Sequence, residues 1–424
     1  MTRRIARLLR PTDSRTWALW LAAALAGCAA PPPAAPPPAA ASAASAAGAA
    51  AVEQRFAQWV AAFRPSALAA GIAPATFDAA FAQAEYLPQV VALDRAQPEF
   101  VRPVWAYLDA AVSARRVAQG RAEWDAARTQ VEAAAALGVA PEILVAIWGI
   151  ESDYGRHNGS IPTISALATL AFDGRREAWA RAELMAALRI LQDGDVAPAR
   201  MVGSWAGAIG QTQLLPSSWL AYAVDADGDG RRDVWDSTAD ALASSANLLA
   251  RAGWRTGEPW GVEVQLPGGF DPARADESVR QPSAQWQAEG LRTIGGAPLP
   301  PLADATVWLP AGMHGPALLV GANFRALLRY NASTSYALAV GVLAQRLAGG
   351  PGVVAPWPRA QAPLSRSQVE ALQAALNAQG FDSGAADGSF GPRTRQALRR
   401  WQQSVGLPAD GWPTLELLEQ LRSP

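Results

Sequence analysis

The chain has 424 residues, of which 50% are hydrophobic, and this length allows one large hydrophobic core or two unequal ones. Its 36 positively charged residues are all arginine and nearly balance 37 acidic residues, so the formal net charge is -1. Such a balance offers no general electrostatic attraction to nucleic acid, which is therefore not an expected partner.

Residues 1–27 have the pattern of a secretory signal peptide. Arginines up to Arg15 precede an apolar run at 17–26, which is too short to cross a membrane. The run ends in Leu-Ala-Gly-Cys28, which resembles the bacterial lipobox. This resemblance implies that Cys28 receives lipid after cleavage, and Ala29 favours the periplasmic face of the outer membrane. Cys28 is the only cysteine, so a disulfide within the chain is excluded.

Residues 28–51 are expected to form a tether behind this lipid anchor. From residue 29 onward the segment contains only Ala, Pro, Ser and Gly, which cannot bury a hydrophobic core. We predict a semi-rigid, partly polyproline conformation for it.

Residues 52–348 have apolar residues at helical spacing, with Gly or Pro at the ends of the segments. Examples are 58–63, 104–112, 142–150, 181–191, 239–251 and 335–347. The pattern changes between 260 and 309, where Val262, Val264 and Leu266 alternate as in a strand. We predict a mainly α domain with small β or loop insertions.

One acid stands out on the helix that is predicted to begin at Pro141. Ile143, Ile147 and Glu151 are spaced at i, i+4 and i+8, so Glu151 continues the apolar stripe of that helix. A carboxyl group in this place should lose solvent and hold its proton more tightly than in water. A general acid that works near neutral pH needs this property, although a buried glutamate is more often structural.

Residues 146–155, Ala-Ile-Trp-Gly-Ile-Glu-Ser-Asp-Tyr-Gly, closely resemble a motif of the B-type lytic transglycosylases, which cleave peptidoglycan. The stretches 163–176, 203–213 and 215–218 are similar to the same family in order and spacing. The similarity extends over residues 52–348. It implies a lysozyme-like helical fold around a sugar-binding groove.

The family resemblance also implies a mechanism with a single carboxylic acid. Glu151 would protonate the glycosidic oxygen between N-acetylmuramic acid and N-acetylglucosamine, and would then accept the proton of the muramyl C6 hydroxyl. The product is a 1,6-anhydromuramyl end. The sequence agrees with a single acid, because the only nearby acid, Asp153, is two residues after Glu151 and would face another side of a helix. Substrate-binding residues implied by the resemblance are Ser204, Gln213, Tyr330, Asn331 and Trp179.

Residues 225–236 match the spacing of an EF-hand calcium loop. The pattern predicts a structural Ca²⁺ ion, with no part in the chemistry, or alternatively a solvated Asp/Gly turn. The closing ligand is Asp236 by position in the loop, or Asp240 by family resemblance. The remaining predicted ligands are the side chains of Asp225, Asp227 and Asp229 and the backbone carbonyl of Arg231.

Residues 349–363 are rich in Gly and Pro and are predicted to link this body to a compact tail at 364–421. Ser367 and Glu370 are spaced as a capping box at the start of a helix. The tail resembles the peptidoglycan-binding type-1 domain, most clearly at 385–402, which implies a small three-helix binding module. It contains no His or Cys, so a zinc amidase is not expected there.

The expected partners are peptidoglycan glycan strands and, through Cys28, a membrane. Proteins of cell-wall synthesis or division are candidate partners as well. Two other functions stay open: a hydrolytic muramidase that uses Glu151, and a non-catalytic scaffold that binds the cell wall. A metal-dependent amidase or peptidase has too few ligands unless acids contribute, because His157 and His314 are the only histidines.

Overall fold

The computed structural model describes residues 38–96 and 103–422. The chain divides into two units, Met1–Ala51 and Val52–Pro424. The predicted signal peptide and the predicted lipid-attachment residue Cys28 lie outside the described residues. Within the described part of the chain, no helix combines the length and the hydropathy needed to cross a bilayer.

Helix α1 (Pro38–Ala69) takes in the second part of the predicted tether. The expected polyproline conformation is therefore wrong for residues 38–51. After Pro38 this stretch has no proline and consists mainly of alanine, which has the highest helix propensity. Pro38 itself occupies the first turn, where its missing N–H group costs nothing.

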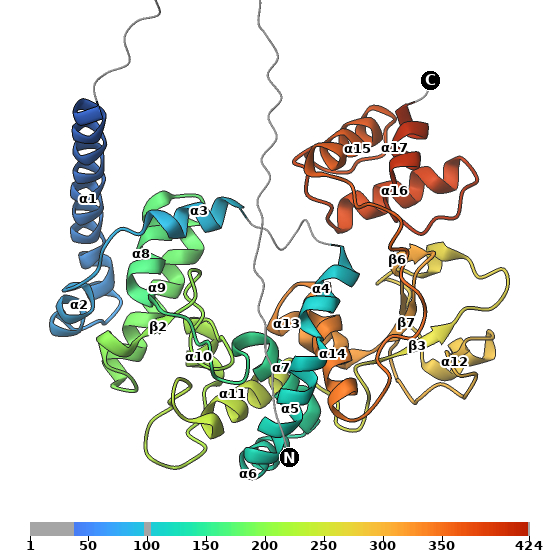
Figure 1. Cartoon of the computed structure of the whole chain (residues 1–424), viewed down its shortest axis with the longest axis horizontal. Coiled ribbons are helices and arrows are strands. Elements are labelled where there is room, and N and C mark those ends of the chain that lie inside the picture. Colours follow the sequence, from blue (N-terminus) through green and yellow to red (C-terminus); the bar gives the residue numbers. More distant parts are fainter. Residues whose placement is uncertain (1–37, 97–102, 423–424) are drawn as a thin grey trace, which may run out of the picture. The chain divides into compact units, whose positions relative to one another are not determined.

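Most of Val52–Pro424 is helical, as the sequence predicts. Helices α8 and α9 pack against each other, α10 packs on α9, and α7 packs against α14, α6 and α5 (Figure 1). These helices are α2 (Pro74–Phe81), α3 (Pro88–Ala96), α4 (Val104–Ala111), α5 (Ala114–Ala126), α6 (Arg128–Ala135), α7 (Pro141–Ser152), α8 (Thr163–Asp173), α9 (Glu177–Asp193), α10 (Pro216–Tyr222), α11 (Thr238–Arg251), α13 (Ala322–Tyr330) and α14 (Thr334–Leu347).

Two large hydrophobic cores hold most of these helices in place, and a smaller cluster joins α3 to α8 and α9. One contains apolar residues of α1, α2 and α8 to α10. The other contains residues of α4 to α7, α11, α13 and α14, with α7 at its centre. Leu144, Val145, Ala146 and Ile147 are all fully buried, so α7 is covered on every side in its middle turns. A helix with this burial holds its end residues in a defined position.

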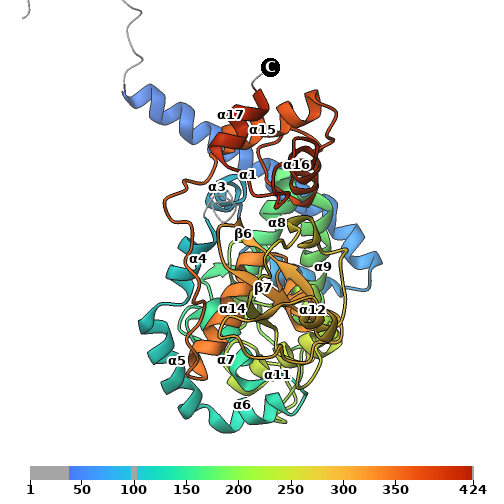
Figure 2. The same ribbon diagram turned by 90° about the vertical axis from the view of Figure 1, so that its right-hand side faces the viewer.

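A small antiparallel sheet follows α11, in the region where the sequence predicts strands. Its order is β4-β3-β7-β5, and Leu319 pairs with Val262 on one side and with Val307 on the other. Helix α12 (Ser283–Ala288) lies close to this sheet (Figure 2), and its Trp286 is fully buried in the same core as Leu319. The strands are β3 (Gly261–Gln265), β4 (Arg292–Thr293), β5 (Thr306–Trp308), β6 (Pro310–Met313) and β7 (Ala317–Val320); β1 (Ile161–Pro162) and β2 (Val202–Gly203) pair separately.

The tail forms three helices around its own core, α15 (Arg366–Ala378), α16 (Pro392–Ser404) and α17 (Leu415–Arg422). The predicted capping box is wrong by two residues, because Ser365 and Gln368 form it instead of Ser367 and Glu370. Both pairs have the required spacing. The earlier one places Leu364 and Val369 in the tail core, where they flank the cap as a hydrophobic staple.

Candidate active site

Glu151 lies in the last turn of α7 and continues a buried stripe of that helix. Ile143 and Ile147, the two residues before it in the stripe, are 3% and 0% exposed. The helix begins with Pro141 in its first turn, as the sequence predicts. Glu151 itself is half-buried, so the buried stripe leads from the core to an acid that still meets solvent.

The carboxyl group of Glu151 has an unusual proton affinity. Burial raises the pKa of Glu151 to about 7, because the surrounding protein penalises the charged form. The hydroxyl group of Tyr336 faces the carboxyl group and partly lowers this pKa, although its geometry falls outside that of a regular hydrogen bond. Within the described residues, no second carboxylate contributes to the pKa of Glu151. Glu151 is thus an isolated acid that still holds its proton in a large share of molecules at neutral pH.

Two parallel tyrosine rings stand beside Glu151. The ring centroids of Tyr330 in α13 and Tyr336 in α14 are 6.3 Å apart, with an interplanar angle of 9°. The Tyr330 hydroxyl donates to the carbonyl oxygen of Thr212 at 2.6 Å and lies 3.1 Å from Oγ of Ser245. Burial, and after it the charge of Glu151, raises the pKa of both tyrosine hydroxyls. Both groups therefore stay protonated and remain hydrogen-bond donors.

Sequence reasoning identified Tyr330 but missed Tyr336 and Ser245. Tyr336 lies six residues after Tyr330, on the next helix, and Ser245 comes from α11. Tyr107 of α4 is a further neighbour, close to Tyr336. These residues are not part of a sequence motif or of a helical repeat. They come together near Glu151 only because α4, α11, α13 and α14 pack in one core with α7.

Gln213 and Asn331 are chain neighbours of residues in this cluster. Gln213 follows Thr212 and has a left-handed backbone with φ 50°. Its side-chain amide donates to the carbonyl oxygens of Gly210 and Asn158 at 2.8 and 3.0 Å. Asn331 follows Tyr330, ends α13 and is exposed. Each of these two predicted residues is thus next in the chain to a residue of the Tyr330–Thr212 hydrogen bond.

Ser204 has a role within its own turn. Its Oγ accepts a hydrogen bond from the backbone N–H of Ala208 at 3.1 Å, and its backbone N–H donates to the carbonyl oxygen of the same residue. These bonds close the turn 204–208, which follows β2. The predicted substrate-binding serine is therefore held rigidly, and its hydroxyl proton remains available to a ligand.

Trp179 lies in α9 and packs against the same small hydrophobic cluster as Trp205, the chain neighbour of Ser204. It lines an open hollow of about 750 Å³ formed by residues of 174–181, and Glu151 is not among the residues that line it. The guanidinium group of Arg176 lies 3.9 Å from the centroid of the Trp179 ring. A sugar that stacked on this face of the ring would first have to displace Arg176.

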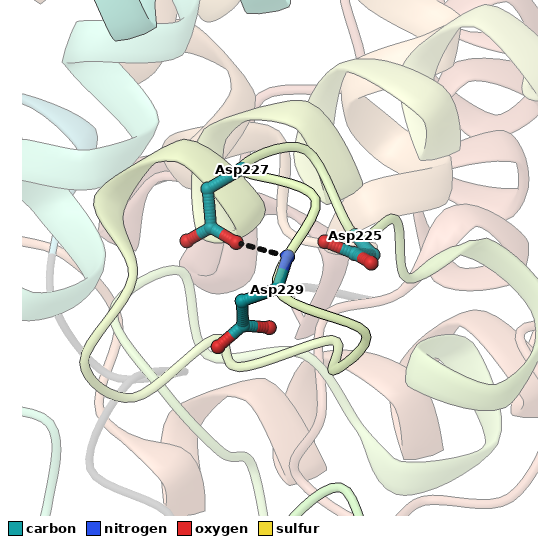
Figure 3. A group of neighbouring side chains, drawn as sticks. All are labelled: Asp225, Asp227 and Asp229. Atoms are coloured by element: carbon teal, nitrogen blue, oxygen red, sulfur yellow. Dashed lines mark hydrogen bonds between the residues drawn. The ribbon is translucent and has the colours of Figure 1, made fainter.

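The Asp-rich loop brings three predicted ligands together. Carboxylate oxygens of Asp225, Asp227 and Asp229 lie within 4.8 Å of one another (Figure 3). Asp225 also accepts hydrogen bonds from the backbone N–H groups of Gly228 and Gly230, which curl the loop around it. Three exposed carboxylates at this distance repel one another, and hard cations such as Ca²⁺ prefer oxygen ligands of this kind. The residues present therefore fit a calcium ion.

Asp236 and Asp240, the two candidates for the closing ligand, do not belong to this group of three carboxylates. The two oxygens of fully buried Asp240 accept hydrogen bonds from Ala226 N–H and Asp233 N–H, both at 2.8 Å. Asp240 therefore supports the backbone of the loop. Asp236 forms an ion pair with Arg200. The guanidinium group of Arg231 lies 3.0 Å from Oδ2 of Asp229.

Gln211 connects the Asp-rich loop to α7, and sequence reasoning assigned it no role. Its Oε1 accepts a hydrogen bond from the indole N–H of Trp148 at 2.9 Å, and its Nε2 donates to the carbonyl oxygen of Trp235 at 3.3 Å. Gln211 is buried. The end of the loop and the helix that carries Glu151 are therefore joined by one side chain.

Two family models match this chain. A transglycosylase SLT domain matches residues 55–345, and a putative peptidoglycan-binding domain matches residues 365–421. The membrane-bound lytic murein transglycosylase B of Escherichia coli is 36% identical over 230 residues, which cover 50% of this chain and 58% of that relative. The match thus spans less than two thirds of the relative's length.

Solved structures are similar over a larger share of the chain. SltB3 from Pseudomonas aeruginosa, in complex with NAG-anhNAM-pentapeptide, is 51% identical with a TM-score of 0.83, and the alignment covers 87% of this chain and 99% of that one. The E. coli lytic transglycosylase Slt35 in complex with calcium is 32% identical, with a TM-score of 0.57 and coverage of 70% and 93%. These similarities confirm the predicted lysozyme-like helical fold and the separate tail module.

Proposed function

This chain belongs to the transglycosylase SLT domain family, and we propose that it is a lytic transglycosylase that cleaves the β-1,4 bond between N-acetylmuramic acid and N-acetylglucosamine in peptidoglycan. The observation that carries this proposal is Glu151: a half-buried acid at the end of a buried helix stripe, with a pKa of about 7 and no carboxylate partner within the described residues. Glycosidases that use water or a covalent intermediate usually have two carboxylates across the scissile bond.

In the proposed reaction Glu151 acts first as acid and then as base. The protonated carboxyl group gives its proton to the glycosidic oxygen, and the bond from that oxygen to C1 of the muramyl sugar breaks. The acetamido group of the substrate stabilises the developing positive charge at C1. The Glu151 carboxylate then takes the proton of the C6 hydroxyl, whose oxygen bonds to C1. One proton is given and one is regained, so no water is consumed and a 1,6-anhydromuramyl end results.

The residues around Glu151 support this cycle. Tyr336 faces the carboxyl group and remains protonated, so it can stabilise the carboxylate form between the two steps. We propose that Gln213, Tyr330 and Asn331 contact the muramyl sugar, and that the tail module binds the glycan strand away from the cleaved bond. In SltB3, whose structure holds a NAG-anhNAM-pentapeptide, 51% of aligned residues are identical to this chain.

Analysis of the products tests the proposed reaction. Mass spectrometry of muropeptides released by the purified protein should find 1,6-anhydromuramyl ends. Reducing muramyl ends would instead identify a hydrolytic muramidase.

Replacement of Glu151 tests the site. Glu151→Gln should lower kcat by about 10²–10⁴, the usual contribution of general acid–base catalysis. The control Glu142→Gln, at the start of the same helix, should retain the kcat of the parent. Equal activity of Glu151→Gln and parent would refute the assignment, and inactivity of the parent itself would favour a non-catalytic wall-binding scaffold.

We further propose a structural Ca²⁺ ion at Asp225, Asp227 and Asp229. The close approach of their carboxylates supports it, and the similar E. coli protein Slt35 has been crystallised in complex with calcium. The ion would hold the loop beside Gln211 and take no part in proton transfer.

Attachment to the outer membrane through Cys28 rests on the sequence and is likewise a proposal. Cells that express the protein and are fed labelled palmitate should incorporate the label. A Cys28→Ser variant should incorporate none and should leave the membrane fraction. Labelling of that variant would exclude Cys28 as the lipid site.

A further inference from the structure

The turn directly after α7 has an unusual backbone. Asp153 and Tyr154 follow Glu151 by two and three residues, and their φ angles are 53° and 64°. Both residues are thus in the left-handed region, which a bulky side chain such as Tyr rarely occupies. Strained conformations of this kind persist only where surrounding contacts enforce them, and they cluster at functional sites.

The Tyr154 side chain supplies the contacts that enforce this turn. Its ring is 4% exposed and meets the ring of Trp148 edge to face, with centroids 5.7 Å apart and an interplanar angle of 88°. Its hydroxyl donates to the carbonyl oxygen of Arg116 in α5 at 2.8 Å. The turn after α7 is therefore tied to the neighbouring helix α5.

Two glycines make room for the Tyr154 ring, one on each helix. A Cβ atom on Gly149 of α7 would lie 2.5 Å from Cζ of Tyr154, and one on Gly120 of α5 would lie 2.2 Å from its hydroxyl oxygen. Both distances are shorter than real Cβ contacts, so any larger residue would push the ring away. Gly149 is two residues before Glu151, so the ring lies against the same turn of α7 that carries the acid.

Further bonds hold the same turn from other directions. Asp153 lies between Arg115 and Arg116 of α5, at 3.8 and 3.7 Å. Trp148 is bonded to Gln211, as described above. The backbone N–H of Tyr154 donates to the carbonyl oxygen of Trp148 at 3.2 Å and closes the end of the helix.

We propose that Tyr154 is a positioning residue for Glu151: its ring, held between Gly149 and Gly120, sets the orientation of the last turn of α7. In this position the Glu151 carboxyl group faces Tyr336 and is partly shielded from water. A displaced ring would rotate that turn, and more water would reach the carboxyl group. The proposal rests on the proposed function only in that Glu151 is the catalytic acid.

Gly149→Ala tests the proposal directly. Alanine favours helices more than glycine does, so only the collision with Tyr154 makes this change harmful. We expect kcat to fall by about tenfold to a hundredfold, as for small misplacements of a catalytic group, with KM within about twofold of the parent. The pH above which kcat declines should also become lower, because a hydrated Glu151 loses its proton more easily.

Two further variants keep this test decisive. Leu319→Ala removes a buried side chain of β7 in a different core, so it should lower the melting temperature without changing kcat or its pH profile. Tyr154→Phe keeps the ring and loses only the bond to Arg116, and should lower kcat by about threefold to tenfold. This variant serves if Gly149→Ala does not fold.

Unchanged kcat and pH profile in folded Gly149→Ala, or in Tyr154→Phe, would overturn the proposal. A loss of kcat in Gly149→Ala without a shifted pH profile would also do so, because it would indicate a general loss of structure. Product analysis of the parent is separate: reducing muramyl ends would refute the transglycosylase reaction and leave the positioning of Glu151 to be judged by the same variants.

Discussion

At the scale of single residues, the chemistry depends on how the protein surrounds one carboxyl group. Burial raises the pKa of Glu151 to about 7, while Tyr336 opposes this shift. An acid with this pKa is protonated often enough to give its proton and is ionised easily enough to take one back. Both halves of the proposed reaction therefore depend on the balance between burial and one hydroxyl group.

The pH dependence of activity should reveal this balance. Because Glu151 must be protonated to start the reaction, kcat should decline above about pH 7. Tyr336→Phe removes the group that lowers the pKa of Glu151, so this decline should begin at higher pH. The control is Tyr86→Phe, in the other hydrophobic core. It should leave the pH at which kcat declines unchanged. A decline that begins at lower pH in Tyr336→Phe would contradict the role of this hydroxyl.

The same raised pKa predicts a pH-dependent cost in stability. The pKa of this carboxyl group is about 4.5 in the unfolded chain and about 7 in the folded protein. Between these values the folded state binds more protons, so the free energy of unfolding of the parent falls as the pH rises. Glu151→Gln cannot ionise and should be more stable than the parent above pH 7, by about 3 kcal/mol, with little difference at pH 4. Urea unfolding of both proteins at pH 4 and above pH 7 measures these free energies. An equal difference in stability between variant and parent at both pH values would contradict the raised pKa.

At the scale of elements, the Asp-rich loop and α7 are connected parts of one arrangement. Asp240 in the first turn of α11 holds the loop backbone through Ala226 and Asp233. Gln211 then joins the end of the loop to Trp148 of α7. The proposed Ca²⁺ ion would thus stabilise the surroundings of Glu151 indirectly, by relieving repulsion among the loop carboxylates.

Calcium should therefore raise the melting temperature. Binding to the folded state alone stabilises by about 2.7 kcal/mol at a hundred times Kd. Asp227→Asn should weaken the response, because it removes the negative charge of one of the three clustered carboxylates. Asp236→Asn should retain it, because Asp236 pairs with Arg200. Scanning calorimetry with and without excess Ca²⁺ measures both. A parent that does not respond would exclude the site, and a loss of response in Asp236→Asn would make Asp236 the closing ligand.

At the scale of the whole molecule, the tail module packs on the body of the same unit. Arg399 of α16 donates to Oδ2 of Asp276 at 2.6 Å, and the backbone N–H of Met313 donates to Asp410 at 3.0 Å. The predicted linker is bound as well, because Glu263 accepts hydrogen bonds from the N–H groups of Val354 and Ala355, both at 2.7 Å. The proposed wall-binding module therefore has a defined attachment to the domain that carries Glu151.

Loss of the Arg399–Asp276 pair should loosen this attachment. The two side chains are 10% and 21% exposed, and removing one partner of a buried pair costs up to about 3–5 kcal/mol. In Arg399→Ala the tail should melt before the body, and trypsin should cut within 349–363 sooner. Arg393→Ala breaks a pair whose side chains are 66% and 64% exposed and should cost less than about 1 kcal/mol. Identical calorimetric and proteolytic behaviour of the two variants would contradict a docked tail.

The features that the sequence determined by itself are those that depend on residues a few positions apart in the chain. The i, i+4, i+8 stripe placed Glu151 on a buried face, and the Asp-x-Asp-x-Asp spacing brought three carboxylates together, because helices and tight loops fix the distances between near neighbours. The helical content and the three-helix tail followed from the same kind of local pattern.

The tertiary structure alone determined which side chains contact these features. Tyr336 and Ser245 reach the cluster around Glu151 from separate helices, Arg176 covers Trp179, and Asp236 pairs with Arg200 instead of joining the loop carboxylates. Even the choice between two capping boxes depended on the burial of Leu364 in the tail core. Such contacts join residues that are distant in the chain, and their geometry follows from how whole helices pack, which no local spacing encodes.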